Sequence, residues 1–386
     1  MDGDSGPSLP ITTGVSRARE PETAARELFD SLWRPGLGTV LFFCSPRYDL
    51  PRLEEAMNKR FGEIHLVGCT TAGEITPLGY IDGSITGIGF AEPDFTAVSV
   101  LIQGLEDFRI ATSSNLVQRA LSELKTATAA SPSGSTFAFL MIDGMSRQEE
   151  QVVSAVYNAL EQIPVLGGSA GDDLSFGATY VFKDGHFHGG GAVLLLVHTV
   201  HPFRIIKTEH FQSTGKRMVV TEADSDRRLV SELNAEPAAH EYARIVGVSR
   251  EHLTPLVFAA HPLIVRVGGE YHVRSIQQAN EDGSLSFLCA IDEGIVLTAA
   301  ESGDIVQDLQ DFFRDVRREI GPLQLVIGCD CILRRLEIER NEVKDQISRV
   351  LLENRVIGFS TYGEQYNSMH VNQTFTGVAI GYAAPE

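Results

Sequence analysis

Three short turns along the chain combine glycine, small or hydroxyl residues and a carboxylate, and each follows an apolar run. They occupy residues 67–74, 166–173 and 357–364. Glycine and hydroxyl residues leave backbone N–H groups open at the end of a strand, which suits a small anion or polar ligand. The carboxylates of these turns suit metal ligation, acid–base chemistry or ligand anchoring, and they are Glu74, Asp172, Asp173 and Glu364. Carboxylates at such turns also cap backbone N–H groups, which is the purely structural alternative.

The third turn is the best individual candidate, because the hydroxyls of Ser360, Thr361 and Tyr362 crowd Glu364. The turns therefore predict ligand-binding residues in their first and third copies, namely Thr70, Thr71, Glu74, Ser360, Thr361 and Glu364. Arg334, with Arg335 beside it, is suited to bidentate contact with a carboxylate or phosphate. A salt bridge with one of the many acidic side chains is the alternative for these arginines.

Two cysteines, Cys329 and Cys331, end an apolar strand, and period-two alternation places both sulfurs on one face. Two thiolates hold a soft metal only if about two further ligands join them, and buried free thiols are the commoner outcome. Gly167–Gly171 matches the letters of a nucleophile elbow around Ser169. An elbow needs a helix straight after the serine, and the following residues predict a loop, so an enzyme is the least favoured class.

The surroundings of the turns repeat as a unit of strand, helix, strand and strand. Each turn is preceded by a buried-type strand and an amphipathic helix, and is followed by another apolar strand. The pattern predicts an α/β (mixed α+β) fold. Between the second and third units, short strand-like runs separated by Gly-Gly and Asp-Gly predict an antiparallel meander. We expect a disordered segment at 1–19, a domain of two repeats at 20–200, and a domain of meander plus third repeat at 201–386.

Composition limits the classes of function. The 386 residues are 43% hydrophobic and 22% charged, as in an ordinary soluble protein. A formal charge of −19 without a long Lys/Arg cluster argues against nucleic acid as a partner. The polar start lacks a secretory signal, no apolar run is long enough to insert into a membrane, and five scattered cysteines form no disulfide framework. We expect a cytoplasmic protein that does not insert directly into a membrane.

These motifs together resemble the FIST family, in which an N-terminal and a C-terminal FIST region form a sensory module. The resemblance runs from about Thr39 to Tyr382 and rests on Gly68–Glu74, Arg274–Ile276, Asp292–Gly294, Asp330–Arg335, Gly358–Gln365 and Met369–Thr374. It adds Arg274 and Asn372 to the predicted ligand-binding residues. The expected two domains then correspond to FIST N and FIST C.

The resemblance implies a ligand sensor in bacterial signal transduction, with amino acids among the proposed ligands. A stand-alone subset of the family, the NosP group, senses nitric oxide through haem b and associates with a sensor histidine kinase or an enzyme of cyclic-di-GMP turnover. No kinase, receiver or cyclase segment is present in this sequence, so the signal would pass to a partner protein. A homo-oligomer is compatible with such an arrangement. The candidate axial ligands, in order, are His210, His370, His188 and His261.

Three hypotheses follow. The leading one is a haem-dependent nitric oxide sensor that regulates a partner kinase. The second is a module that binds an amino acid or other small polar molecule without haem. The third is an interaction scaffold in which the turns are purely structural, so that Glu364→Gln and Arg334→Ala affect folding rather than binding.

Overall fold

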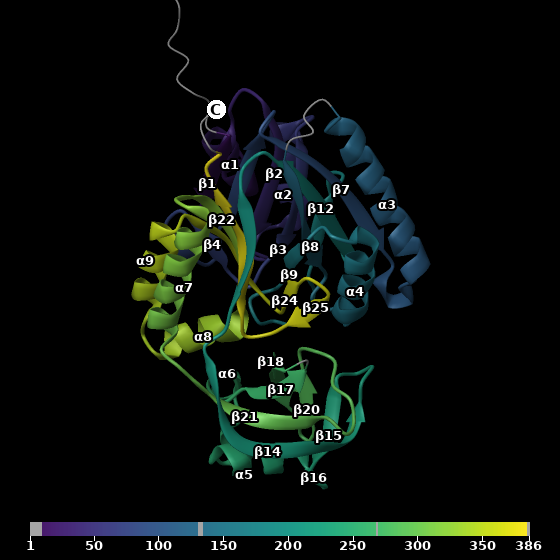
Figure 1. The fold of residues 1–386 in the computed structure, drawn as a ribbon, viewed down its shortest axis with the longest axis vertical. Coiled ribbons are helices and arrows are strands. Elements are labelled where there is room, and N and C mark those ends of the chain that lie inside the picture. Colours follow the sequence, from purple (N-terminus) through teal and green to yellow (C-terminus); the bar gives the residue numbers. More distant parts are fainter. Residues whose placement is uncertain (1–9, 130–133, 268, 384–386) are drawn as a thin grey trace, which may run out of the picture.

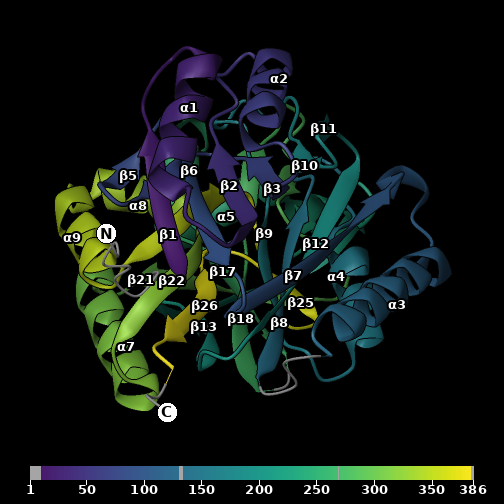
Figure 2. The ribbon, with the colours of Figure 1, turned by 90° about the horizontal axis from the view of Figure 1, so that it is seen from above.

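In the computed structural model, which describes residues 10–129, 134–267 and 269–383, three six-stranded sheets form an α/β body, and a smaller antiparallel domain lies beneath it (Figure 1). The mixed α+β fold class expected from the sequence is confirmed. Figure 2 shows the helices of the three repeats in three sectors around the sheets, with α1 and α2, α3 and α4, and α7 and α9 on successive sides.

The first sheet carries the first turn. Its strands in spatial order are β1 (Ile11–Ser16), β6 (Ile85–Ala91), β2 (Leu37–Cys44), β3 (His65–Thr70), β10 (Val181–Lys183) and β11 (His186–His188). Helices α1 (Pro21–Leu32) and α2 (Leu50–Phe61) cover its outer face, where Leu28 and Leu53 are buried. Proline at the start of α1 and the Asp49 side chain capping α2 fix where these helices begin.

The second and third sheets have the same plan. The second sheet consists of β7 (Phe95–Gln103), β12 (Gly191–Thr199), β8 (Ser135–Ile142), β9 (Val165–Ser169), β24 (Glu364–Tyr366) and β25 (Met369–Val371), with helices α3 (Ile110–Ala127) and α4 (Glu149–Leu160). The third consists of β13 (Phe203–Thr208), β26 (Phe375–Gly381), β22 (Leu323–Cys331), β23 (Val356–Thr361), β4 (Glu74–Thr76) and β5 (Gly79–Ile81), with helices α7 (Ile305–Ile320), α8 (Ile332–Arg340) and α9 (Lys344–Glu353).

A short hairpin from each repeat completes the sheet of another repeat. The hairpin β4–β5 of the first repeat pairs with β23 of the third. The hairpin β10–β11 of the second repeat pairs with β3 of the first. The hairpin β24–β25 of the third repeat pairs with β9 of the second. The exchange is cyclic, so every repeat both receives and donates a hairpin.

The inner faces of the three sheets share one apolar core. The rings of Phe43 and Phe359 are stacked with centroids 4.6 Å apart, and Phe139 lies 6.1 Å from Phe43, so each repeat contributes one ring. Strands covered on both faces are apolar at nearly every position, and this is why β2, β8 and β22 appear in the sequence as continuous apolar runs. The repeats are therefore fused into a single body.

The antiparallel domain is an insertion within the third repeat. The chain leaves the body after β13 and returns at α7. Between them lie β14 (Phe211–Asp224), β15 (Leu229–Leu233), β16 (Glu236–Pro237), α5 (Ala238–Val246), α6 (Pro255–Ala260), β17 (Leu263–Val267), β18 (Glu270–Arg274), β19 (Ile276–Ala279), β20 (Leu285–Phe287) and β21 (Val296–Ser302). These strands form one antiparallel sheet with its own apolar core, which confirms the predicted meander. We call residues 211–302 the insertion domain.

Two expectations about domain boundaries need correction. Residues 1–19 were expected to be disordered, but Ile11–Ser16 form β1, paired in register with β6; residues 1–9 lie outside the described part. Ile11 and Ser16 are buried against the body, which explains the order. The division at 200/201 separates the second and third repeats in sequence only, because the shared core joins them. Among the described residues, no helix is long and apolar enough to cross a membrane.

Candidate functional site

The three turns meet on the side of the body that packs against the insertion domain, and they hold one another through backbone hydrogen bonds. The N–H of Ala72 donates to Ser360 O at 2.9 Å, and the N–H of Gly171 donates to Thr70 O at 3.0 Å. The third contact of the same kind runs from the N–H of Tyr362 to Ser169 O at 3.4 Å. The open N–H groups expected at the turns are thus largely used within the protein.

In the first turn the Glu74 carboxylate caps neighbouring groups. One oxygen accepts from the N–H and hydroxyl of Ser84 at 3.0 and 2.6 Å, and the other accepts from Thr71 Oγ1 at 2.6 Å. Glu74 is fully buried, and burial raises the pKa of its carboxyl to about 7 although these hydrogen bonds oppose the rise. Thr70 Oγ1 accepts the N–H of Tyr180 at 3.0 Å. These predicted ligand residues have structural partners.

The second turn differs from the other two. Glu74 and Glu364 are each the first residue of an exchanged hairpin, whereas the corresponding hairpin of the second repeat begins with Val181. A longer loop, 172–180, separates this turn from its hairpin. The expected equivalence of the turn carboxylates therefore holds for Glu74 and Glu364 and fails for Asp173, because the apolar Val181 occupies the matching ladder position.

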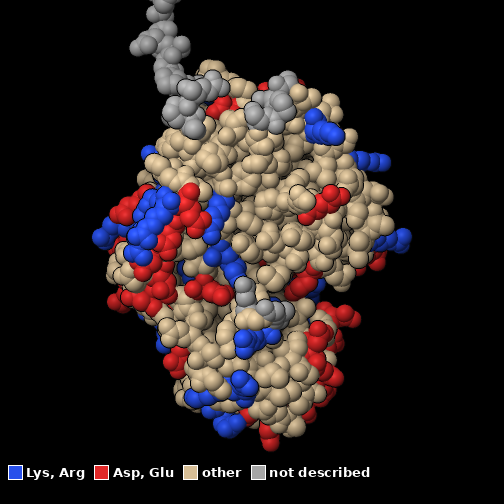
Figure 3. Space-filling model, in the orientation of Figure 1, with Lys and Arg blue, Asp and Glu red and all other residues tan. Residues whose placement is uncertain are grey.

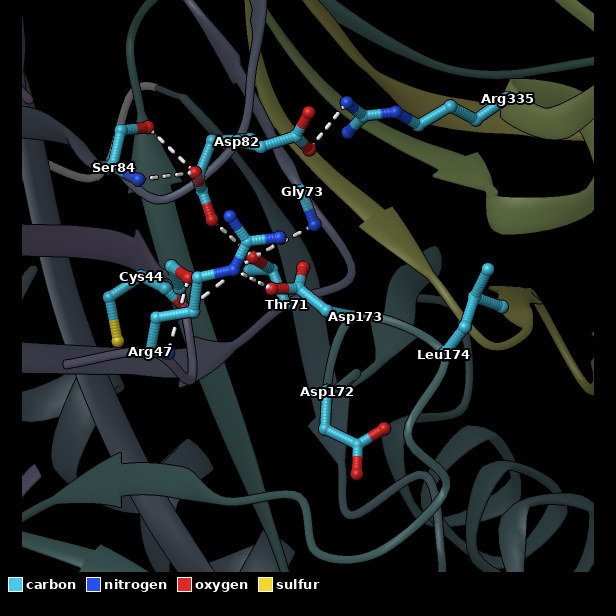
Figure 4. Close-up of polar contacts among 12 residues, drawn as sticks. Cys44, Arg47, Thr71, Gly73, Asp82, Ser84, Asp172, Asp173, Leu174 and Arg335 are labelled. Atoms are coloured by element: carbon cyan, nitrogen blue, oxygen red, sulfur yellow. Dashed lines mark hydrogen bonds and ion pairs between the residues drawn. The ribbon is translucent and has the colours of Figure 1, made fainter. Parts of the chain in front are cut away.

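Asp172 organises the extra loop instead. It accepts hydrogen bonds from the backbone N–H groups of residues 176–178 at 2.7 to 3.0 Å, and from the hydroxyl of Tyr362. Asp173 reaches the first repeat, where its Oδ2 lies 2.8 Å from Nε of Arg47 (Figure 4). Ser169 is buried, its hydroxyl accepts from Gln365 at 3.1 Å, and a loop rather than a helix follows it. The arrangement of a nucleophile elbow is thus not present here.

In the third turn Glu364 repeats the role of Glu74. Its Oε2 accepts from the N–H and hydroxyl of Thr374, and burial raises the pKa of the carboxyl well above its ordinary value. Thr361 Oγ1 donates to the carbonyls of Ser169 and Gly363 at 2.7 and 2.8 Å. Ser360 Oγ lies 3.5 Å from Arg335. Most polar groups of this turn are again satisfied internally.

Arg334 lies in a buried network of charges rather than at a ligand-accessible surface. Its Nε donates to Asp330 Oδ1 at 2.7 Å, and Asp330 also accepts from the hydroxyl of Tyr80. The other end of its guanidinium lies 2.7 Å from Nδ1 of His210, whose Nε2 lies 2.9 Å from Glu337. The salt-bridge alternative therefore describes Arg334. Arg335 pairs with Asp82 at 2.5 Å (Figure 4).

A set of buried polar atoms without partners lies just beyond the third turn. Among the described residues, both amide atoms of Asn372, Nδ1 of His370 and Oε1 of Gln373 are buried and have no hydrogen-bond partner. Asn372 and Gln373 are fully buried. Buried polar groups are nearly always hydrogen-bonded, and orphaned ones indicate a water, ion or ligand that belongs there. We call His370, Asn372 and Gln373 the β25 cluster.

The β25 cluster faces the insertion domain. His370 Nε2 lies 3.4 Å from Leu288 O, and Gln373 Nε2 donates to Ala259 O, at the end of α6, at 3.0 Å. The N–H of Leu288 donates to Ser275 O, next to Arg274, and both the Ser275 hydroxyl and Arg274 Nε are buried without a partner in the described structure. The predicted residues Asn372 and Arg274 thus come from the two sides of one junction.

The second repeat closes this junction. Arg228 of the insertion domain donates to Leu288 O at 2.9 Å and to the carboxylates of Glu149 and Glu150, on α4, at 2.6 Å each. Glu150 also accepts from the N–H of Ala290 at 2.7 Å. Sequence reasoning missed Gln373, Arg228 and Glu150 as site residues. Their contacts join segments far apart in the chain, so no local spacing could identify them.

The four histidines proposed for haem do not lie around a common pocket. His210 has both ring nitrogens in contact with charged side chains, and burial lowers its pKa. His188 contacts Gln103 and Lys183 O, and His261 is half-buried beside Arg340. The ring of His370 packs directly against Gly363. An axial ligand of haem needs a ring nitrogen that is not already engaged, and of these four histidines His370 has a buried one, Nδ1, without a partner among the described residues.

The cysteine pair is packed in apolar surroundings. Cys329 belongs to the shared core, and Cys331 packs with Leu333 and Tyr362. Burial raises the pKa of both thiols, which disfavours the thiolate form that binds metals. Among the residues that the structure describes, no three His, Cys, Asp or Glu side chains gather closely enough to hold a metal ion.

Comparisons with known proteins identify the family. The FIST N domain matches residues 38–236 and the FIST C domain matches residues 238–367. An uncharacterized protein of Methanocaldococcus jannaschii, MJ1623, is 22% identical over 274 residues, which are 62% of this chain and 53% of that protein. The chain thus spans about half the length of this curated relative. With both regions matched in order, the chain belongs to the FIST family, whose domains are sensory ligand-binding domains of signalling proteins.

Proposed function

We propose that this protein senses a small polar molecule, an amino acid being the best fit, bound where the β25 cluster meets the insertion domain. The observation that carries the proposal is Asn372, whose side-chain amide is fully buried and has neither its donor nor its acceptor satisfied by a described residue. An amide offers both hydrogen-bonding roles at once, which suits a ligand that carries an ammonium and a carboxylate group.

The neighbours of Asn372 add complementary groups. Arg274 supplies a guanidinium for a carboxylate, and Gln373 and His370 supply buried atoms that seek partners. The ligand would lie between the body and a domain joined to it by two connections, after β13 and before α7. A ligand held by both sides stabilises one placement of the insertion domain over others, which is what a sensor requires.

A thermal-shift screen of the common amino acids tests this proposal. At a ligand concentration of about 100 Kd, binding to the native state adds roughly 2.7 kcal/mol to the free energy of unfolding. We expect at least one amino acid to raise the Tm of the wild-type protein and Asn372→Ala to abolish that rise. Asn115→Ala, on an exposed position of α3, is the matched control and should keep it. Failure of all amino acids, or an equal rise in the Asn372→Ala variant, contradicts the proposal.

Haem-based sensing of nitric oxide, as in the NosP group, stays a second prediction. Regulation of a sensor histidine kinase or a cyclic-di-GMP enzyme, assembly into a homo-oligomer and a cytoplasmic location also stay predictions. His370 is the histidine of choice for haem, because its Nδ1 is buried and lacks a partner among described residues. An absorption spectrum recorded after haem addition tests this prediction. A Soret band that shifts with nitric oxide and is lost in His370→Ala supports haem binding, whereas the absence of a Soret band in the wild type excludes it.

A further inference from the structure

A cavity of about 340 Å³ opens beside the first turn, and three arginines line it. Its walls come from three loops that the first sheet brings together: Arg17 and Arg19 follow β1, Arg47 and Tyr48 precede α2, and Asp82 and Gly83 lie between β5 and β6. No predicted ligand residue lines this cavity, and it is separate from the β25 cluster.

The cavity carries positive charge that the protein leaves unneutralised. Arg17 and Arg19 form no hydrogen bond or ion pair with any residue in the described ranges. Arg47 uses only Nε, toward Asp173, and Asp82 is engaged by Arg335 from outside the cavity.

The charged surface over α7 is arranged differently. Figure 3 shows acidic and basic side chains interspersed over α7, where Arg314 pairs with Asp311 and Arg318 with Asp315. Such pairs neutralise one another and serve mainly solubility. The cavity differs from the surface over α7 in that Arg17 and Arg19 have no acidic partner among the described residues.

The backbone that presents these arginines is held in place. Ala18, between Arg17 and Arg19, donates its N–H to Ser16 Oγ at 3.1 Å and accepts the hydroxyl of Tyr48 at 2.8 Å. The N–H of Arg47 donates to Ser45 Oγ at 3.2 Å. Fixed loops reduce the conformational entropy lost when an anion binds between the guanidinium groups.

We propose that this cavity binds the phosphate group of a small phosphorylated molecule. Guanidinium N–H groups match phosphate oxygens in fork-like pairs, and clustered arginines raise the local concentration of anions. A volume of about 340 Å³ exceeds what a phosphate alone needs and leaves room for an attached organic group. The site is independent of the amino-acid site proposed above and stands whether or not that proposal holds.

Isothermal titration calorimetry with inorganic phosphate and with glycerol 3-phosphate tests the site in the full chain. We expect saturable binding that weakens with added KCl and that falls at least about tenfold in the Arg17→Gln/Arg19→Gln variant. Arg119→Gln, an exposed arginine of α3, removes a charge elsewhere and should bind as the wild type does. Tighter binding of the ester than of the free ion indicates that its organic part also occupies the cavity.

Two results overturn the proposal: no saturable binding of either probe at low ionic strength, or equal affinities in the wild type and the double variant. Both substituted side chains are exposed, so folding should be unaffected. An unchanged Tm without phosphate, measured for each variant, verifies this.

Discussion

Glu364 and Thr374 form a buried pair in which a single carboxylate oxygen, Oε2, accepts both the N–H of Thr374 at 3.1 Å and its hydroxyl at 2.7 Å. Glu74 and Ser84 repeat this contact at the same ten-residue separation. The other oxygen of Glu364, Oε1, is buried and has no hydrogen-bond partner among the described residues. This relationship makes Glu364 a buried acid with a structural role.

Glu364→Gln should therefore stabilise the protein at alkaline pH. The folded-state pKa of Glu364 is raised well above 4.5, so the wild type loses stability as pH rises from the unfolded pKa through the folded one. A glutamine keeps an acceptor for Thr374 and has no such loss. Urea unfolding at pH 4 and pH 8 measures the effect. We expect a gain in the free energy of unfolding at pH 8 and little change at pH 4; a loss at pH 8 contradicts the assignment.

Glu74 should give the chain a pH-dependent stability in the neutral range. Its folded pKa of about 7 lies above the ordinary 4.5, so the stability it contributes is complete below pH 4.5 and is lost as pH rises through 7. The loss is on the order of 3 kcal/mol. Unfolding free energies at half-unit steps from pH 5 to 8 should decline less steeply in Glu74→Gln than in the wild type. Parallel curves would show that Glu74 is not the responsible group.

Arg334→Met should reduce stability rather than ligand affinity. It leaves Asp330 buried with only the Tyr80 hydroxyl as a partner, and removing one member of a buried ion pair costs about 3–5 kcal/mol. Adding Asp330→Leu should recover part of the loss. The free energies of unfolding of the single and double variants test this prediction. If Arg334→Met lowers the free energy of unfolding by less than about 1 kcal/mol, the result contradicts a buried ion pair.

Gly363→Ala should disrupt the β25 cluster without unfolding the protein. A Cβ at this position would lie 2.2 Å from Cε1 of His370 and 3.0 Å from Nδ2 of Asn372, so these side chains must move. We expect the ligand-induced rise in Tm to disappear while the circular dichroism spectrum is retained. Gly177→Ala is the control, since its added Cβ meets only Asp172, at 3.6 Å. Retained ligand response in Gly363→Ala would place the ligand elsewhere.

Local patterns predicted the repeats and the meander, because apolar periodicity and turn chemistry act within a few residues. They did not predict the exchange of hairpins, because a three-residue strand such as β4 carries no signal of which sheet it joins. Sequence spacing also did not reveal the extra loop after the second turn. Because of that loop, Val181 occupies the position in the strand pairing where a carboxylate was expected. Asn372 and Arg274 were identified through family resemblance, whereas Gln373 and Glu150 depend on contacts made only in the folded chain.

The cyclic exchange of hairpins makes the three repeats of this chain depend on one another. One repeat alone would leave the strand that receives a hairpin, such as β3, with an open edge. Its own hairpin would have no sheet to join. Removal of any one repeat from this chain would therefore leave an open sheet edge on one of its neighbours and an unpaired hairpin on the other, so no repeat is dispensable for the pairing of the other two.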